Sequence, residues 1–149
     1  MNRVVIIGSG NLAEALARAL AAARGLQLMQ IHARNEERGR ELARIAGCAW
    51  SGDPAALAPA DLYLIAVSDR AVAEVAERLP IPHGAAVAHT AGSVPMEAIP
   101  AKCARRGVFY PMQTFTKGRA VDFRPIPIFL EASTPELLAE LEEVAQRLS

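Results

Sequence analysis

The feature that most constrains this 149-residue sequence is a glycine-containing turn directly after an unbroken apolar run. Residues 3–8 read R-V-V-I-I-G, without the alternation of a half-exposed strand, and predict a strand that is buried on both faces. Residues 8–13 read G-S-G-N-L-A and match the pattern G-x-G-x-x-A. Leucines and alanines at helical spacing then continue to Ala23. A strand, a glycine turn and a helix in this order predict the first unit of a dinucleotide-binding sheet.

Each position of this motif suits a bound dinucleotide. Gly8 permits the tight turn, Gly10 lets the backbone approach a pyrophosphate, and Ala13 keeps the helix close to the strand. Amide groups and the dipole at the start of a helix attract the anion. The alternative is a turn without a ligand, but its position after a buried strand favours the dinucleotide. The predicted cofactor contacts here are Gly8, Ser9, Gly10, Asn11, Leu12 and Ala13.

The second predicted strand, residues 27–33, is followed by a basic residue where an NAD-binding domain normally has an acid, about 20 residues beyond the motif. This residue is Arg34. A guanidinium binds a 2′-phosphate with two hydrogen bonds, whereas a carboxylate repels it, so the sequence predicts NADP as the cofactor. Asn35 is expected to cap the next helix and to contact the cofactor. Arg38 is either a second phosphate contact or, as the stronger interpretation, a solvated surface charge.

Strands and helices alternate along the rest of the chain. Further strands are expected at 48–50, 62–67, 85–89, 108–110 and 126–131, with helical segments opening at Asn35, Asp53, Asp69 and Thr134. Short connections favour one α/β domain over residues 1–149, with a doubly wound, mainly parallel sheet of the Rossmann type. The irregular segment 92–117 is the expected place for a substrate pocket.

The last predicted helix has an apolar face at helical spacing. Its members are Leu137, Leu141, Val144 and Leu148. This face covers either the sheet of the same chain or another subunit.

The charge balance of the sequence limits the classes of partner that the protein can bind. Lys and Arg together number 16, as do Asp and Glu, so the chain lacks the positive field that nucleic acid or an anionic membrane requires. Residues 1–24 imitate a secretory signal, but Glu14 and Arg18 interrupt it. Cys48 and Cys103 lack the spacing of metal ligands, and we expect no metal site. A cytoplasmic protein with a small-molecule substrate, and no membrane or nucleic-acid partner, is therefore expected.

Polar residues follow the remaining strands at the edge where open α/β sheets bind ligands. Val67 and Ser68 are expected to contact the ribose or nicotinamide mainly through their backbone, and Thr90 belongs to the same predicted cofactor site. Asp69 is expected to cap the helix that follows. Ser68 and Thr90 also have an alternative interpretation as simple turn residues.

Two residues are candidates for catalysis. His89 follows a buried strand and titrates near neutrality, so it is the first candidate for a proton donor, although a buried histidine that hydrogen-bonds the neighbouring loop is an equally open interpretation. Tyr110 is expected either to orient the substrate or to pack the irregular loop. His32 and His83 are expected to lie outside this cluster.

Four segments in order carry a family resemblance: A-V-S-D at 66–69, H-T-A-G-S at 89–93, G-V-F-Y-P-M-Q-T-F at 107–115 and I-P-I-F-L-E at 126–131. Together they resemble the Rossmann-like family whose C-terminal half is domain of unknown function 2520. That family is similar in architecture to pyrroline-5-carboxylate reductases and deazaflavin-dependent NADP reductases. The resemblance implies an NADP-binding N-terminal domain followed by a helical domain that completes the cleft and forms a homodimer. The sequence ends at Ser149, before such a domain.

Two functions of different class remain open. The first is an oxidoreductase that transfers hydride between NADP(H) and a small carbonyl, imine or deazaflavin. The second is a module that binds or senses NADP(H) without catalysis.

Overall fold

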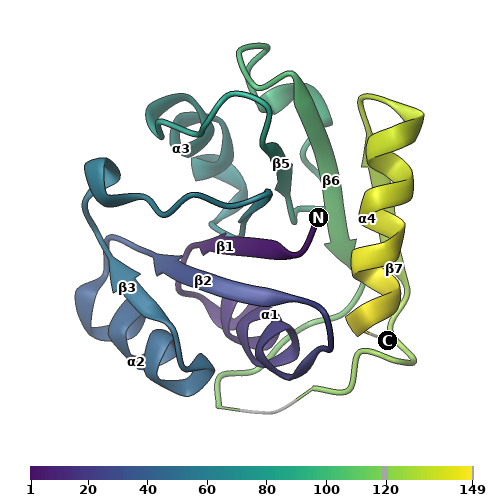
Figure 1. The fold of residues 1–149 in the computed structure, drawn as a ribbon. Helices are drawn as coiled ribbons and strands as arrows, with labels where there is room; N and C mark the ends of the chain where they lie inside the picture. The colour runs from purple at the N-terminus through teal and green to yellow at the C-terminus, as the bar shows by residue number, and fades with distance from the viewer. Residues whose placement is uncertain (119–120, 149) are drawn as a thin grey trace.

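The computed structural model describes residues 1–118 and 121–148, which form a seven-stranded sheet flanked by helices (Figure 1). The strands are β1 (Arg3–Ile7), β2 (Gln27–His32), β3 (Ala49–Ser51), β4 (Leu62–Ile65), β5 (Ala86–His89), β6 (Arg105–Pro111) and β7 (Ile128–Ala132). The helices are α1 (Asn11–Ala22), α2 (Glu36–Ala46), α3 (Val72–Arg78) and α4 (Pro135–Leu148). Short 3₁₀ turns are η1 (Pro54–Ala56), η2 (Asp69–Ala71) and η3 (Met96–Ala98).

The strands lie in the order β3-β2-β1-β4-β5-β6-β7. The first six are parallel, and β7 pairs antiparallel with β6 at the edge. This is the doubly wound order of a Rossmann fold with one added antiparallel strand, so the predicted fold class is confirmed. The chain switches direction across the sheet between β1 and β4, and ligands of such sheets bind beside the carboxyl ends of the strands at that point.

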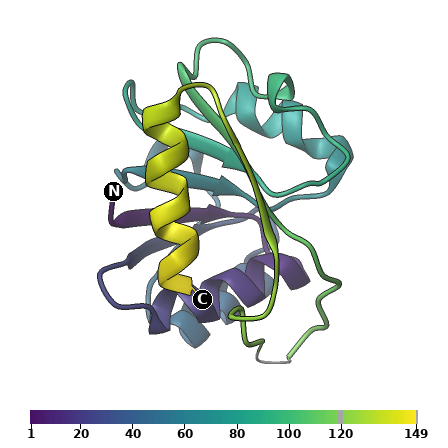
Figure 2. The same cartoon turned by 90° about the vertical axis from the view of Figure 1, so that its right-hand side faces the viewer.

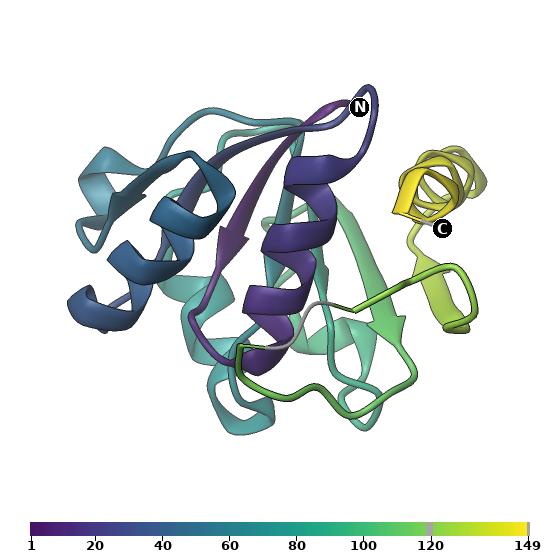
Figure 3. The ribbon, with the colours of Figure 1, turned by 90° about the horizontal axis from the view of Figure 1, so that it is seen from below.

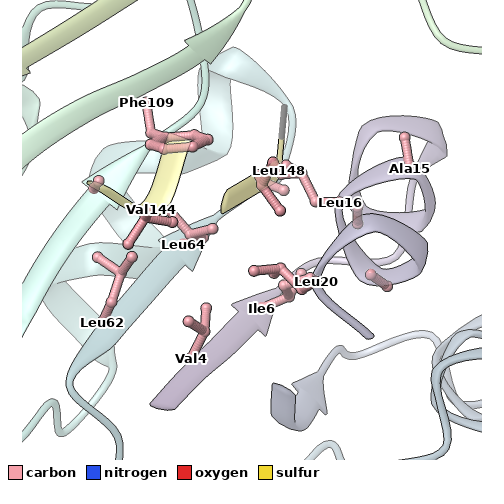
Figure 4. Packing of buried hydrophobic residues seen from close by; sticks show 14 of the residues in the cluster. Val4, Ile6, Ala15, Leu16, Leu20, Leu62, Leu64, Phe109, Val144 and Leu148 are labelled. Carbon is pink, nitrogen blue, oxygen red and sulfur yellow. The ribbon is translucent and has the colours of Figure 1, made fainter. Parts of the chain in front are cut away.

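Alternate residues of the buried strands pack against opposite faces of the sheet. Helices α1, α2 and α4 cover one face and α3 the other (Figures 1 and 3). Figure 4 shows the first face, where strand side chains Val4, Ile6, Leu62, Leu64 and Phe109 meet Leu16 and Leu20 of α1 and Val144 and Leu148 of α4. None of the helices within residues 1–118 and 121–148 is long and apolar enough to cross a membrane.

The ends of two helices follow the predicted capping chemistry. The Asn35 side chain accepts a hydrogen bond from the Arg38 amide at the start of α2, and Gly47 ends that helix in the left-handed conformation with φ of 73°. The Thr134 hydroxyl accepts from the Leu137 amide at the start of α4. Figure 2 shows α4 lying in front of the sheet, and its apolar face is at most 8% exposed. The alternative that this face covers another subunit is therefore wrong.

Two expectations about local structure need correction. The segment 92–117 is less irregular than expected, because its predicted strand at 108–110 extends over Arg105–Pro111 as β6 and pairs with both β5 and β7. Asp69 does not cap a helix: Ser68 holds the cap position of η2, and the Asp69 carboxylate accepts a hydrogen bond of 2.8 Å from the Ser93 hydroxyl. Because the 3₁₀ turn η2 precedes α3, the cap position lies at Ser68, one residue before Asp69. The Asp69 carboxylate can therefore bind Ser93 in the loop after β5.

The described residues between β6 and β7, 112–118 and 121–127, here called the crossing segment, lie along α1 on the side that Figure 3 shows. Its buried rings Phe115 and Phe123 stack with centroids 5.7 Å apart, and the Gly118 amide donates to Glu14 of α1 at 3.0 Å. Glu14 is 2% exposed and also accepts from Arg18 at 3.0 Å and from Arg38 of α2 at 2.6 Å. One buried carboxylate thus joins α1, α2 and this crossing segment.

Arg38 takes neither of the roles expected for it. Its guanidinium, 14% exposed, pairs with Glu14 and Glu41, and it does not line the cavity described below. Its positive charge is therefore balanced by two carboxylates of the protein itself. Burial alone would raise the pKa of Glu14, but the hydrogen bonds from Arg38 and Arg18 outweigh burial, and the net pKa is lowered.

We predict that Glu14→Gln destabilises the fold by about 3 kcal/mol, because it leaves the Arg38 guanidinium without its buried partner. Because the folded-state pKa of Glu14 is lowered, its stabilising effect is present above about pH 5 and is lost as the pH falls through that lowered pKa. Urea unfolding measures both effects, and the gap between parent and variant should close in acid.

The matched control is Glu143→Gln, which removes an exposed carboxylate from the ion pair with Arg147 and should change stability little. Equal losses for the two variants would show that the Glu14 network adds no more stability than a surface pair.

Candidate functional site

The carboxyl ends of β1, β2, β4 and β5 open onto one cavity of about 570 Å³. The loops after these strands supply most of its wall, and α3 with its leading turn supplies one side. The lining consists of residues 7–12, 32–35 and 66–69, together with Ala71, Val75, Arg78, Thr90 and Ala91. The cavity therefore lies at the switch point of the sheet, where a dinucleotide is expected.

Gly8 is required by the protein itself. Its φ is 126°, and a Cβ at this position would lie 2.2 Å from the carbonyl oxygen of Ala66 in the loop after β4. Its amide donates to the carbonyl oxygen of His32 at 2.9 Å, which ties the end of β1 to the end of β2. The tight turn predicted at this position is thus a three-way junction of strand ends.

Gly10 has no such requirement. Its φ is −80°, and a Cβ would meet nothing within 4 Å, so neither backbone conformation nor packing excludes a side chain. Gly10 is the cap residue of α1, and no side chain caps the first amides of this helix. A pyrophosphate placed against these amides explains both features, because it would fill the space of the missing Cβ and accept the free hydrogen bonds.

The other motif residues divide between wall and core. Ser9, Asn11 and Leu12 line the cavity beside the two glycines. Ala13 does not line it: this side chain is 0% exposed and packs in the core beneath α1, as its role in holding the helix close to the strand requires. The predicted contact of Ala13 with the cofactor is therefore corrected to a packing role.

Arg34 and Asn35 line the end of the cavity beside β2, as the sequence predicts. The Arg34 side chain is exposed, and no described residue forms a hydrogen bond or ion pair with it. An uncommitted guanidinium beside a helix N-terminus is suited to hold a phosphate.

The sequence interpretation missed two residues at this end. Arg78, at the last position of α3, lines the cavity and stands at helical spacing from Val75 and Ala71, which line it too. That shared helix face is the signal that could have revealed Arg78. His32 was expected outside the site but lines the cavity at the end of β2.

His32 is 2% exposed, and its Nδ1 atom is buried without a hydrogen-bond partner among the described residues. Burial lowers the pKa of its imidazole, and the charge of Arg78 lowers it further, while Asp53 acts in the opposite direction. The ring is therefore neutral near pH 7 in the ligand-free protein.

The opposite end of the cavity lies beside the ends of β4 and β5. Val67 and Ser68 line it directly after β4, and Thr90 follows β5. The Thr90 hydroxyl donates to the carbonyl oxygen of Ile65 at 3.1 Å, so this side chain links the two strand ends. What Thr90 and its neighbours offer to a ligand here is chiefly their main chain.

Neither catalytic candidate lines the cavity among the described residues. His89 is 0% exposed; its Nδ1 accepts from the Ala91 amide at 3.1 Å, and its Nε2 lies 3.2 Å from the carbonyl oxygen of Pro95. Burial lowers the pKa of His89. A neutral ring with both nitrogens bound to backbone favours the interpretation that His89 holds its loop.

Tyr110 is half-buried in β6, and its ring lies against Gly92 so closely that a Cβ there would be 2.3 Å from the ring. This contact favours the interpretation that Tyr110 packs the loop after β5. His83 lies outside the cavity, as expected.

The family model described as NADP oxidoreductase, coenzyme F420-dependent, matches residues 3–91. A candidate NADP oxidoreductase from Bacteroides fragilis has a solved structure similar to this chain, with a TM-score of 0.91 and 42% identity over 99% of this chain and 58% of that one. Among curated proteins, no sequence match is found.

Two more distant structures share the fold. The prephenate dehydrogenase of A. aeolicus, solved with hydroxyphenyl propionate and NAD⁺, has a TM-score of 0.81 at 14% identity over 100% of this chain and 58% of that one. The 1-pyrroline-5-carboxylate reductase of Streptococcus pyogenes has a TM-score of 0.75 at 15% identity over 99% and 56%. This chain thus spans less than two thirds of each of these proteins.

The expected similarity to pyrroline-5-carboxylate reductases and deazaflavin-dependent NADP reductases is confirmed. The finer resemblance, to the family with domain of unknown function 2520, stays a prediction. The matched family uses a nicotinamide dinucleotide, which is the cofactor class of this domain.

We predict opposite outcomes for two alanine substitutions in the turn. Gly8→Ala should lower the thermal unfolding temperature strongly, because its Cβ would overlap the Ala66 carbonyl and its φ is unfavourable for alanine. Gly10→Ala should leave that temperature within a few degrees but weaken dinucleotide binding about tenfold or more, because its Cβ would occupy ligand space.

Thermal melts and calorimetric titration with a nicotinamide dinucleotide separate these effects. A Gly10→Ala protein that binds as tightly as the parent would remove the pyrophosphate from this turn.

Proposed function

We propose that this chain, which belongs to the coenzyme F420-dependent NADP oxidoreductase family, is the NADP(H)-binding domain of an oxidoreductase. The observation that carries the proposal is the pairing of an uncapped α1 terminus with the unpaired guanidinium of Arg34 in one cavity. The first suits the pyrophosphate and the second the 2′-phosphate.

The residues of the cavity have distinct roles in this proposal. The amides at the start of α1 bind the pyrophosphate, and Arg34 and Asn35 hold the ribose with its 2′-phosphate. Val67, Ser68 and Thr90 flank the nicotinamide ribose through their backbone. When bound, the nicotinamide supplies or accepts a hydride. The reaction partner would be a small carbonyl, imine or deazaflavin, and a cytoplasmic location and a homodimeric longer form remain predictions.

One observation favours the alternative of a binding module without catalysis. Among the described residues, Asp69 is the sole ionisable residue in the wall at the nicotinamide end, and its carboxylate is bonded to Ser93. His89 is committed to the backbone. Proton transfer to a substrate would then need a group from a partner chain or from the part of the longer relatives that this chain does not span.

We predict that calorimetric titration shows tighter binding of NADP⁺ than of NAD⁺, and that Arg34→Asp weakens NADP⁺ binding about 10- to 100-fold, with little loss for NAD⁺. The reason is the exchange of a bidentate partner of the 2′-phosphate for a repelling charge. Arg44→Asp is the matched control, since Arg44 is exposed on α2 and does not line the cavity. Equal affinities for both cofactors in the parent would contradict the assignment of NADP.

Catalysis is tested by following the absorbance of NADPH with the three acceptor classes. If the chain is an oxidoreductase domain that is complete in itself, one class will drive NADPH oxidation at a rate that depends on acceptor concentration. Tight NADPH binding without oxidation by any acceptor supports either the binding module or an oxidoreductase domain that needs a further group.

A further inference from the structure

The cavity wall near β2 contains two arginines without partners. Arg34 follows β2 and Arg78 ends α3; both are exposed, and no described residue forms a hydrogen bond or ion pair with either. Two neighbouring arginines differ in this respect, because Arg38 and Arg40 each pair with a carboxylate. Two uncommitted guanidinium groups facing one cavity indicate a ligand part with more than one negative charge.

The same helix face also offers an apolar surface. Val75 and Ala71 line the cavity one and two turns before Arg78. A flat, uncharged ring can lie on these two side chains while a charged group reaches the arginine at the helix end. Adenine attached to a phosphorylated ribose has this combination of an apolar ring and a dianionic substituent.

His32 lies in the wall between β2 and α3. This residue is only 2% exposed, and it lines the cavity. Its Nδ1 atom has no hydrogen-bond partner among the described residues. A buried polar atom without a partner is rare in folded proteins, and a ligand in the cavity that His32 lines is one group that would satisfy it. A protonated imidazole donates from both nitrogens and is suited to phosphate oxygens.

From this geometry we infer that Arg78 and His32 complete, with Arg34, a subsite for 2′-phosphoadenosine, and that His32 binds a proton when the 2′-phosphate binds. The inference rests on the proposed function, because it requires the 2′-phosphorylated cofactor. It adds two residues that determine specificity and a dependence of binding on pH.

The charges around His32 fix the direction of this dependence. Arg78 from α3 acts on it with positive charge, and Asp53 before η1 acts on it with negative charge. Arg34, from the loop after β2, lines the same cavity with a second positive charge. Burial and Arg78 lower the pKa of His32 in the free protein. A phosphate dianion raises the pKa again, so binding takes up a proton and becomes tighter as the pH falls from 8 toward 7.

The first test uses ligands that differ by one phosphate. Adenosine 2′,5′-bisphosphate and adenosine 5′-monophosphate are titrated against the parent, Arg78→Ala and the control Arg44→Ala. We expect Arg78→Ala to weaken the bisphosphate about tenfold and the monophosphate less than twofold. Arg78→Lys should restore part of the loss. An equal loss for both ligands, or no loss, would overturn the role of Arg78.

The second test measures protons. Titration of NADP⁺ at pH 7 in two buffers of different ionisation enthalpy gives the number of protons exchanged, and NAD⁺ is the comparison. We expect net uptake with NADP⁺ alone, lost in His32→Gln and kept in His83→Gln. A phosphate that merely bound as its dianion would release protons, so release or no exchange in the parent contradicts the proposal.

Because His32 is buried, its substitution can disturb folding, and a measurement on the unaltered protein is needed. The imidazole resonances of the three histidines, followed by NMR against pH, should show one whose pKa rises when adenosine 2′,5′-bisphosphate binds. Unchanged titration of all three would exclude proton binding by His32. A parent without preference for NADP⁺ defeats the proposed function, whereas a preference that depends on Arg34 but not on Arg78 or His32 defeats this inference alone.

Discussion

The contact between Gly8 and the carbonyl oxygen of Ala66 sets the position of everything around the cavity. The two strands β1 and β4 run side by side up to this point, where the loop after β4 passes over the turn that leads into α1. A side chain at Gly8 would push the turn away from the loop after β4. This shift would also strain the hydrogen bond from the Gly8 amide to the carbonyl oxygen of His32. The start of α1, the end of β2 and the loop after β4 are therefore held by one close backbone contact.

The buried carboxylate of Glu14 determines which arginines remain for a ligand. It forms ion pairs with Arg18 and Arg38, and it accepts a hydrogen bond from the Gly118 amide of the crossing segment. Arg38, four residues after Arg34, therefore points toward Glu14 of α1 and is not available to a ligand in the cavity. The positive charge left at this end of the cavity comes from the loop after β2 and from the end of α3, which approach from different sides of the sheet edge.

Local patterns predicted the features that depend on neighbours in the sequence. A few consecutive residues are enough to predict each of three features: the buried run before Gly8, the cap at Asn35, and Arg34 after β2. Contacts between distant segments were not predictable in this way. Arg78 meets the end of β2 only through the packing of α3, Asp69 finds Ser93 across two loops, and Arg38 finds Glu14 across two helices. From the sequence, Gly107 is typical of a loop, but it lies within β6. A glycine is required there because a Cβ would lie 2.8 Å from the carbonyl oxygen of Glu131.

The two ends of the cavity differ in what they can do. The end beside β2 has arginines, a buried imidazole and an apolar helix face, and in the proposed complex these would add binding energy without touching a reacting atom. The other end has Val67, Ser68, Thr90 and one carboxylate, that of Asp69, which already accepts a hydrogen bond from Ser93. Binding energy gathered at a remote part of a cofactor is useful to catalysis when it orients the reacting part. On the proposed function, such a domain would hold and orient the dinucleotide, and selectivity for substrate would depend on the surface that closes over the nicotinamide end.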